Sequence, residues 1–183
     1  MRHRILIALI AIHAIVAHAA ETFPAGLLYG PKAAYKIDAP KGWVLDNQSG
    51  QAQGLPCVLY PAGSHWGDAK VSMYAKIASP EYPKAEEFAR WAIGQFQKEG
   101  GGFRFKRVKD GKTSEGYPYF INEYRRQTGY SRIERAAYVQ LPHAVAYIIF
   151  SAEAEQLYRK YSSALTETVQ SLIYVPRFIG YHE

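Results

Sequence analysis

The sequence has very little cysteine, with one residue, Cys57, in a chain of 183. A single cysteine excludes a disulfide within the chain, so its stability has to come from an apolar core. Cys57 stands between Pro56 and Val58 in an apolar stretch, with no basic neighbour in sequence to lower its pKa. Cysteine in such surroundings behaves as a small buried hydrophobic residue. We therefore expect an unreactive core thiol rather than a nucleophile or a metal ligand.

The chain also lacks the sequence patterns of common nucleotide and metal sites. It has no glycine-rich phosphate loop ending in Gly-Lys-Ser or Gly-Lys-Thr, and no dinucleotide-binding fingerprint after a strand. Beyond the first 19 residues the histidines are His65, His143 and His182, far apart and without paired spacing. A metal site needs three or four converging ligands. We therefore expect neither a metal nor a cofactor.

Long apolar runs are absent except at the N-terminus. Basic side chains among the first four residues precede an apolar run over residues 5–16, and Ala17 and Ala19 are the small residues that a signal peptidase reads. This pattern predicts a secretory signal peptide over residues 1–19, cleaved after Ala19. A membrane anchor is the less favoured alternative, because about 20 apolar residues are needed to span a bilayer. We expect a periplasmic or secreted protein with no transmembrane segment after cleavage.

The remaining residues, 20–183, have the length of one domain and show no internal repeat, low-complexity tract or linker. Removal of Arg2 and Arg4 leaves 20 basic and 16 acidic side chains, so the net charge falls from +6 to +4. A charge of this size favours solubility and weak attraction to anionic surfaces. We expect a single domain over residues 20–183 and no nucleic-acid partner.

Apolar periodicity predicts two helices. One begins at Ala85 and runs for about four turns, with apolar residues at three- and four-residue spacing, until the glycines at 100–102 end it. The other follows Ser151, whose hydroxyl is expected to cap its first turn, and it ends before Pro176. Both helices are amphipathic, so each is expected to cover one face of a sheet.

Apolar and alternating runs predict strands at residues 33–37, 42–46, 57–60, 71–78, 103–108, 117–125, 132–140 and 145–150. The composition of residues 21–31 predicts an irregular segment before the first strand. The pair Asp110-Gly111 predicts a turn. The run at 145–150 has no polar alternation, which predicts a central strand covered on both faces. Hairpin-length connections then favour an α+β fold, a mainly antiparallel sheet with helices on both faces. A β-sandwich is the competing fold, disfavoured by the two amphipathic helices.

This layout resembles the PsbP-like α/β/α sandwich over roughly residues 32–175. The resemblance depends on Gly42-Trp43, on the Tyr60-Pro61-Ala62-Gly63-Ser64-His65-Trp66 loop, on the strand at 71–77 and on the closing strand and helix. The superfamily includes an extrinsic photosystem subunit, a nuclear-import accessory factor and bacterial envelope proteins. What it implies is an exported, non-enzymatic binding or assembly/accessory protein of the bacterial cell envelope. Its partner would be an envelope protein or a small ligand.

The loop between the strands at 57–60 and 71–78 carries the first candidate site, made of Ser64, His65, Trp66 and Asp68. We expect these residues to contact a ligand or partner, or else to shape the loop. A hydrolase using Ser64, His65 and Asp68 is the alternative, since a serine nucleophile needs a base and a group that orients it. Sequence neighbours rarely meet that geometry, and the loop lacks a Gly-x-Ser-x-Gly elbow.

Basic residues on neighbouring predicted strands form the second candidate site. They are Arg104, Lys106, Arg125, Arg126 and Arg132. Tyrosines are interleaved among them, which suits a surface that binds an envelope polymer, an anionic lipid or an acidic protein patch. Glu115, Glu123 and Glu134 dilute the charge. The alternative is therefore an ordinary solvated sheet face without a ligand.

Overall fold

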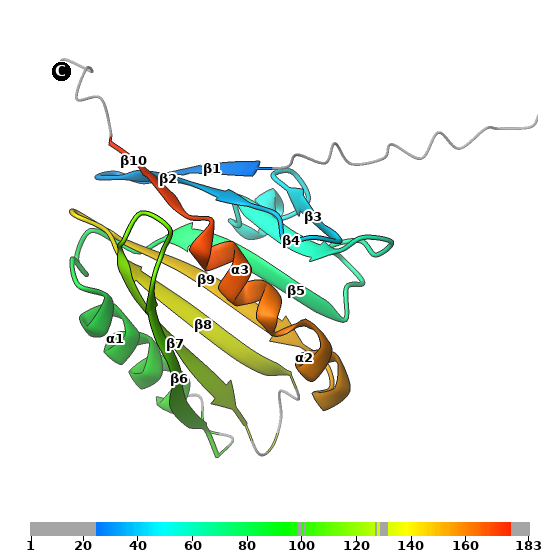
Figure 1. Ribbon diagram of the computed structural model, residues 1–183. Helices are drawn as coiled ribbons and strands as arrows, with labels where there is room; N and C mark the ends of the chain where they lie inside the picture. The colour runs from blue at the N-terminus through cyan, green and yellow to red at the C-terminus, as the bar shows by residue number, and fades with distance from the viewer. Residues whose placement is uncertain (1–24, 99, 101, 127, 129–131, 177–183) are drawn as a thin grey trace, which may run out of the picture.

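The computed structural model describes residues 25–98, 100, 102–126, 128 and 132–176. The predicted signal peptide, residues 1–19, lies outside these residues, and its cleavage stays a prediction. The described chain contains a seven-stranded sheet, a three-stranded sheet and three α-helices (Figure 1).

The large sheet is antiparallel throughout, and its strand order is β3-β4-β5-β9-β8-β7-β6. Its strands are β3 (Trp43–Asp46), β4 (Cys57–Pro61), β5 (Val71–Ile77), β6 (Arg104–Lys112), β7 (Pro118–Arg125), β8 (Ile133–Gln140) and β9 (Val145–Ala152). The small sheet has the order β1-β2-β10, with β1 (Ala25–Tyr29), β2 (Ala34–Asp38) and β10 (Ile173–Val175). The predicted pairing of the strands on either side of the Ser64 loop is confirmed.

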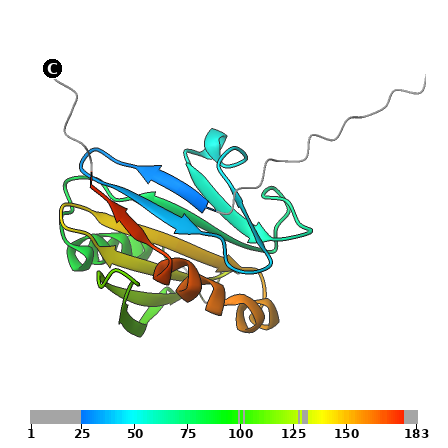
Figure 2. The same cartoon turned by 45° about the horizontal axis from the view of Figure 1, so that its top comes forward.

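Helices cover both faces of the large sheet, as predicted. Helix α1 (Ala85–Lys98) lies on one face, where Phe88 packs with Phe120 and Tyr138. Helices α2 (Glu155–Tyr161) and α3 (Ser163–Gln170) lie on the other, in the core that contains Ile121 and Leu165. Figure 2 shows the small sheet on this second side too, beside α3. The consecutive residues Phe120 and Ile121 belong to different cores because strand side chains alternate between faces.

Strand β9 is central, as its unbroken apolar sequence predicts. It lies fourth of seven in the sheet, between β5 and β8. Val145 packs in the core under α1 and Ile148 in the core under α3, and both side chains are fully buried. Cys57 is also buried, 1% exposed, as expected. Burial raises the pKa of its thiol to about 12, with a smaller contribution from the charge of Asp46.

Residues 21–31, predicted to be irregular, contain β1. Leu28 of this strand is buried, and Gly26 lies so close to the large sheet that a Cβ there would stand 3.0 Å from Leu45 and 3.2 Å from the Cys57 sulfur. The glycine therefore serves close packing rather than a turn. The short strand β10 was not predicted either, since it is three residues long and its partner β2 is distant in sequence.

The predicted turn at Asp110-Gly111 is wrong, because β6 continues through both residues to Lys112. A Cβ on Gly111 would stand 2.6 Å from the ring of Tyr119, its register partner, so the position needs glycine for space. The predicted cap at Ser151 is also wrong. Ser151 lies within β9 instead, and its hydroxyl accepts a hydrogen bond from Arg132 Nε at 2.7 Å. The closing helix is in fact two, α2 and α3, which meet at Ser162.

Candidate functional site

The face of the sheet beside α2 carries a row of charged side chains on β6, β7 and β8. The strand register places Lys106, Glu123 and Arg135 side by side across the three strands. Arg104 and Arg125 form the adjacent register pair on β6 and β7. Because side chains two residues apart share a face, all five lie on the same side of the sheet.

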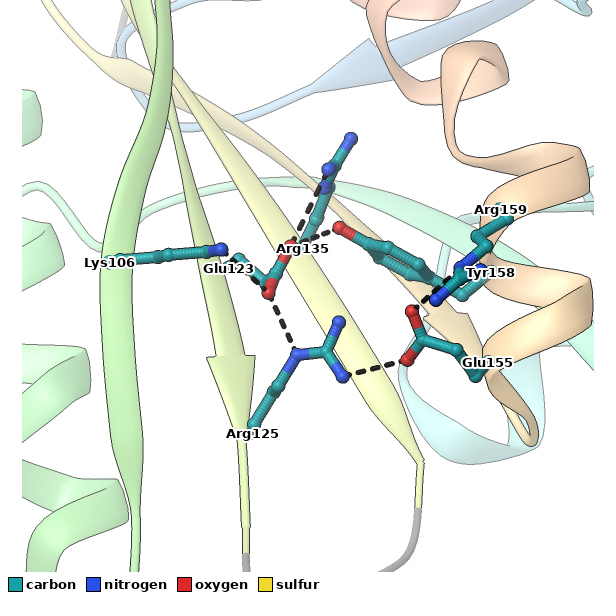
Figure 3. A network of polar contacts seen from close by, with 7 residues as sticks. All are labelled: Lys106, Glu123, Arg125, Arg135, Glu155, Tyr158 and Arg159. Carbon is teal, nitrogen blue, oxygen red and sulfur yellow. Dashed lines mark hydrogen bonds and ion pairs between the residues drawn. The ribbon is translucent and has the colours of Figure 1, made fainter.

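Glu123 is the centre of this row (Figure 3). Its side chain is 4% exposed, yet it carries a charge. Its Oε1 accepts a hydrogen bond from Arg125 Nε at 2.8 Å and lies 3.5 Å from Lys106 Nζ. Its Oε2 accepts hydrogen bonds from the Tyr158 hydroxyl and from Arg135 Nη2, the latter at 3.5 Å. The buried carboxylate is thus compensated by three cations and a phenol, as a buried charge must be.

These contacts fix the protonation of Glu123. Burial by itself raises its pKa, but the hydrogen bonds from Tyr158 and Arg125 and the charges of Arg125 and Lys106 outweigh it and lower the pKa from 4.5 to about 2. The Tyr158 pKa is raised to about 12, first by burial and then by its hydrogen bond to Glu123. Glu123 is therefore ionised and Tyr158 protonated throughout the neutral range. Neither group is placed to exchange a proton there, as a general acid or base must.

Helix α2 is tied to the sheet through the same residues. Glu155 accepts hydrogen bonds from Arg125 Nη1 at 2.8 Å and from Arg159 Nε at 3.2 Å. The guanidinium groups of Arg125 and Arg135 also lie over the Tyr158 ring, 5.3 and 4.7 Å from its centroid. Such cation–π contacts stabilise by about 0.5–1 kcal/mol at exposed sites and by about 2 kcal/mol where the groups are desolvated, and the Tyr158 ring is buried. This network holds Arg125 in one orientation beside the outer strand.

A hollow of about 310 Å³ opens next to this network, lined by Arg104, Phe105, Lys106, Glu123 and Arg125. We call these five residues the cationic groove. Lys106 and Arg125 keep 68% and 42% of their side-chain surface in solvent despite their contacts with Glu123. Three cations against one carboxylate give the groove a net positive charge. Phe105 lines it at the edge of β6, between Arg104 and Lys106, and is 47% exposed. A groove of this charge suits a ligand with an anionic group.

Three of the five predicted basic residues, Arg104, Lys106 and Arg125, line the groove. Arg125 also borders a small neighbouring hollow with the other two, Arg126 and Arg132, and Arg126 lies over the ring of Phe96, 5.6 Å from its centroid. The fifth, Arg132, is 18% exposed and binds Glu153 at 3.1 Å in addition to Ser151. Arg132 thus fastens β8 to β9, and no groove contact involves it among the described residues.

Sequence reasoning missed the residues that hold the groove in place. Glu123 was interpreted as a dilution of the basic charge, and Glu155 and Tyr158 were not assigned to any site. A signal was present, because Glu123 alternates with Ile121 on a strand whose inward side is apolar. A charged residue at an inward position of a period-two pattern needs a buried partner. Arg135, directly opposite on β8, is that partner.

The loop with the first candidate site is held by local hydrogen bonds. The Ser64 hydroxyl donates to the Pro61 carbonyl at 2.7 Å, and Asp68 Oδ1 accepts the His65 backbone N–H at 3.1 Å. Trp66 Nε1 donates to Gln53 at 3.2 Å. Among the contacts described for this loop, none joins the His65 imidazole to Ser64 or Asp68. The hydrolase alternative therefore gains no support from the geometry.

The same loop borders a second hollow of about 350 Å³, where Ser64 and Asp68 face Leu157 and Tyr161 of α2. His65 and Trp66 are not among the residues that line it. Ligand contact through this loop stays a prediction.

Two further observations concern metals and membranes. Within the part of the chain that the structure describes, no group of three or more His, Cys, Asp or Glu side chains is placed to hold a metal ion. In the same residues, no helix combines the length and the apolar character needed to cross a membrane.

Comparison with known proteins reveals similarity of structure without similarity of sequence. No protein-family model matches the chain, and no curated protein matches it in sequence. Cyanobacterial PsbP (CyanoP) from Synechocystis sp. PCC 6803 is similar in structure, with a TM-score of 0.54 and 14% identity over 90% of this chain and 99% of that one. LpqN of Mycobacterium tuberculosis, described as involved in cell envelope biogenesis, has a TM-score of 0.56 and 14% identity over 83% and 91%.

The Ran-binding protein Mog1p of Saccharomyces cerevisiae is also similar, with a TM-score of 0.50 and 11% identity over 85% of this chain and 96% of that one. At these identities the likeness concerns the fold alone. Together with the antiparallel sheet covered by helices on both faces, it confirms the expected architecture: the chain has the PsbP-like fold.

Proposed function

We propose that this protein is an exported, non-enzymatic binding or assembly/accessory protein of the bacterial cell envelope, and that it holds an acidic partner in the cationic groove. The observation that carries the proposal is that Arg104, Lys106 and Arg125 line one hollow together with an ionised, buried Glu123. Surface charges that are evenly scattered would not need a buried carboxylate to hold them in place. Here a buried network orients Lys106 and Arg125 beside the hollow, which is how binding surfaces are pre-organised.

A binding role is favoured over catalysis by the chemistry of the groove. Its carboxylate stays ionised and its neighbouring phenol stays protonated at neutral pH, so the groove offers fixed charge rather than a mobile proton. Two proteins of similar fold have roles of this kind: Mog1p is a Ran-binding protein, and LpqN is involved in cell envelope biogenesis. These roles support the class of function that we propose.

Export is supported by the N-terminal sequence. The basic start, the apolar run over residues 5–16 and the small residues Ala17 and Ala19 follow the order of a secretory signal. The envelope role of LpqN is in keeping with this location.

The experiment compares two charge-matched double variants of the mature protein in sedimentation with native envelope fractions. Arg104→Gln with Lys106→Gln removes two cations from the groove. Lys32→Gln with Lys41→Gln removes two exposed cations from the turns on either side of β2. We expect about tenfold weaker binding for the groove variant only, because each exposed ion pair is worth up to about 1 kcal/mol.

Salt provides the second comparison. Binding of the wild type should weaken from low to physiological ionic strength, because exposed charges are screened over about 8–10 Å. Equal loss in the two double variants would show that net charge rather than the groove is responsible. Unchanged binding in the groove variant would contradict the proposal, provided that urea unfolding shows both variants to be folded.

A further inference from the structure

The groove lies against the outer edge of the large sheet, and this position indicates how a partner is bound. We propose that the outer edge of β6 accepts an extended segment of the partner as an additional strand, in which acidic residues alternate with apolar ones. The proposal rests on the proposed function and specifies the conformation and sequence pattern of the partner.

Strand β6 is an open edge. It ends the strand order of the large sheet and pairs with β7 on one side. Among the residues that the structure describes, no strand pairs with its other side, and Figure 1 shows it at the margin of the sheet. Its nine residues make it the longest of the described strands. The unpaired N–H and C=O groups of such an edge are a template for strand addition, a frequent mode of peptide recognition.

The charge of β6 selects the kind of strand that can be added. Its basic residues are Arg104, Lys106, Arg107, Lys109 and Lys112, against a single acidic residue, Asp110. Basic side chains on an edge strand oppose pairing with a second copy of the same strand, because like charges would lie opposite each other. The same charges favour a strand of opposite sign. An acidic partner segment therefore fits this edge better than a copy of this chain.

The two faces of β6 differ, and this difference sets the alternation. Arg104 and Lys106 are register partners of Arg125 and Glu123 and so lie on the groove face. Phe105 is the partner of Tyr124 on the opposite face, where its ring lies 6.4 Å from that of Phe103. An added strand would place every second side chain over the cations and the intervening ones beside Phe105. Acidic residues suit the first set and apolar residues the second.

A bulge limits the length of the regular edge. The pairing of β6 with β7 shifts register between Arg107 and Lys109, so the regular ladder at this end covers residues 104–107. A bulge twists the edge and interrupts further pairing. The added strand is therefore expected to be short, about four to six residues.

The experiment uses a fluorescent peptide of alternating glutamate and valine, about six residues long, titrated into the mature protein by fluorescence polarisation. Two further peptides carry N-methyl groups, one on every glutamate and the other on every valine, with no change in charge. In a strand, the N–H groups of successive residues point to opposite edges. Strand addition therefore predicts that one N-methylated peptide binds like the parent and the other at least about tenfold more weakly, since several backbone hydrogen bonds are lost.

Equal binding of the two N-methylated peptides would overturn strand addition. If Arg104→Gln with Lys106→Gln still weakened binding to the envelope in that case, the proposed function would stand without it. Failure of the parent peptide to bind would likewise overturn the inference, whereas the envelope experiment tests the groove separately. Amide hydrogen exchange gives a second readout: alternate residues within 104–107, those whose N–H groups point away from β7, should gain protection with the peptide, and an unchanged exchange pattern there would contradict the inference.

Discussion

Glu123 occupies a position that a period-two strand pattern reserves for an apolar side chain. Its neighbour on the same face, Ile121, is 1% exposed and belongs to the core under α3. A charged residue persists there because Arg125, Arg135 and the Tyr158 hydroxyl satisfy its oxygens. The network therefore has two roles at once, since it compensates a buried charge and orients the cations of the groove.

Substitution of Glu123 by alanine should lower the free energy of unfolding by about 3 kcal/mol, the usual cost of removing one partner from a buried ion pair. The substitution leaves the cations Lys106, Arg125 and Arg135 facing one another and deprives Tyr158 of its acceptor. Urea unfolding measures the effect. Glu81→Ala is the control, because Glu81 is exposed and a change there should stay within about 0.5 kcal/mol. An equal, small effect of both substitutions would contradict the role given to Glu123.

The acid limb of the stability curve should depend on the same residue. The pKa of Glu123 is about 2 in the folded protein, below its ordinary value of 4.5, so the unfolded chain binds the proton more readily. Its stabilisation is therefore complete above about pH 4.5 and is lost as the pH falls towards 2. Urea unfolding as a function of pH should show a shallower fall in this interval for Glu123→Gln than for the wild type. Parallel curves would count against the low pKa.

At the scale of the element, helix α1 contains a glycine that lowers its stability. Gly94 lies in its interior, and a Cβ there would meet no atom within 4 Å. Gly94→Ala should therefore raise the free energy of unfolding by about 0.5–1 kcal/mol, because alanine restricts the unfolded chain without strain in the folded one.

Gly63→Ala is the matched comparison for this substitution. Gly63 also has open space around its Cβ position, but its φ is +88°, a conformation that alanine adopts only with strain. It should destabilise the protein by about 1 kcal/mol or more. Thermal or urea unfolding of both variants measures the difference, and a loss of stability in Gly94→Ala would show that α1 packs more tightly than described.

Most elements of the large sheet could be predicted because their signals are local. Period-two alternation, the unbroken apolar run of β9 and the three- and four-residue spacing of α1 are all properties of neighbouring residues. The errors have a different origin. Gly26 and Gly111 were interpreted as turn or loop residues, whereas each makes room for a side chain from another strand. That requirement exists only in the folded molecule.

Only part of the candidate site could be predicted from the sequence, because only some of its residues are marked by local signals. Arg104, Lys106 and Arg125 stand out by charge and lie in strands that follow one another, so their proximity could be inferred. Tyr158 is 35 residues from Glu123, and Arg135 is 12 residues away. The register of β7 with β8 and the docking of α2 decide that they meet, and single-sequence patterns specify neither.

At the scale of the whole molecule, charge is distributed unevenly between the two edges of the large sheet. The edge strand β3 has one charged residue, the buried Asp46, whereas β6 at the opposite edge has five basic residues and one acidic residue. The modest net charge of +4 expected for residues 20–183 therefore conceals a strongly positive edge. Such local fields steer an acidic partner to one side of a protein.

Export of the molecule has its own test. Expression of the full chain in a bacterial host should give a periplasmic or secreted product. Its mass should be that of a chain starting at Ala20, because Ala17 and Ala19 supply the small residues that signal peptidase requires. Intact-mass spectrometry of the exported protein measures this directly. The substitution Ala19→Arg should block cleavage and serves as the control. A product that retains residues 1–19 in the wild type would contradict the prediction.

The most direct measurement of where this protein binds its partner is site-specific photo-crosslinking in the producing cell. A photoreactive phenylalanine analogue replaces Phe105 of the cationic groove in one strain and Leu27 of the small sheet in another, positions that are 47% and 44% exposed. We expect a discrete crosslinked envelope species at Phe105 that disappears when Arg104 and Lys106 are changed to glutamine, and none at Leu27. The same species from both positions, or a species at Phe105 that survives loss of the two cations, would contradict binding through the groove.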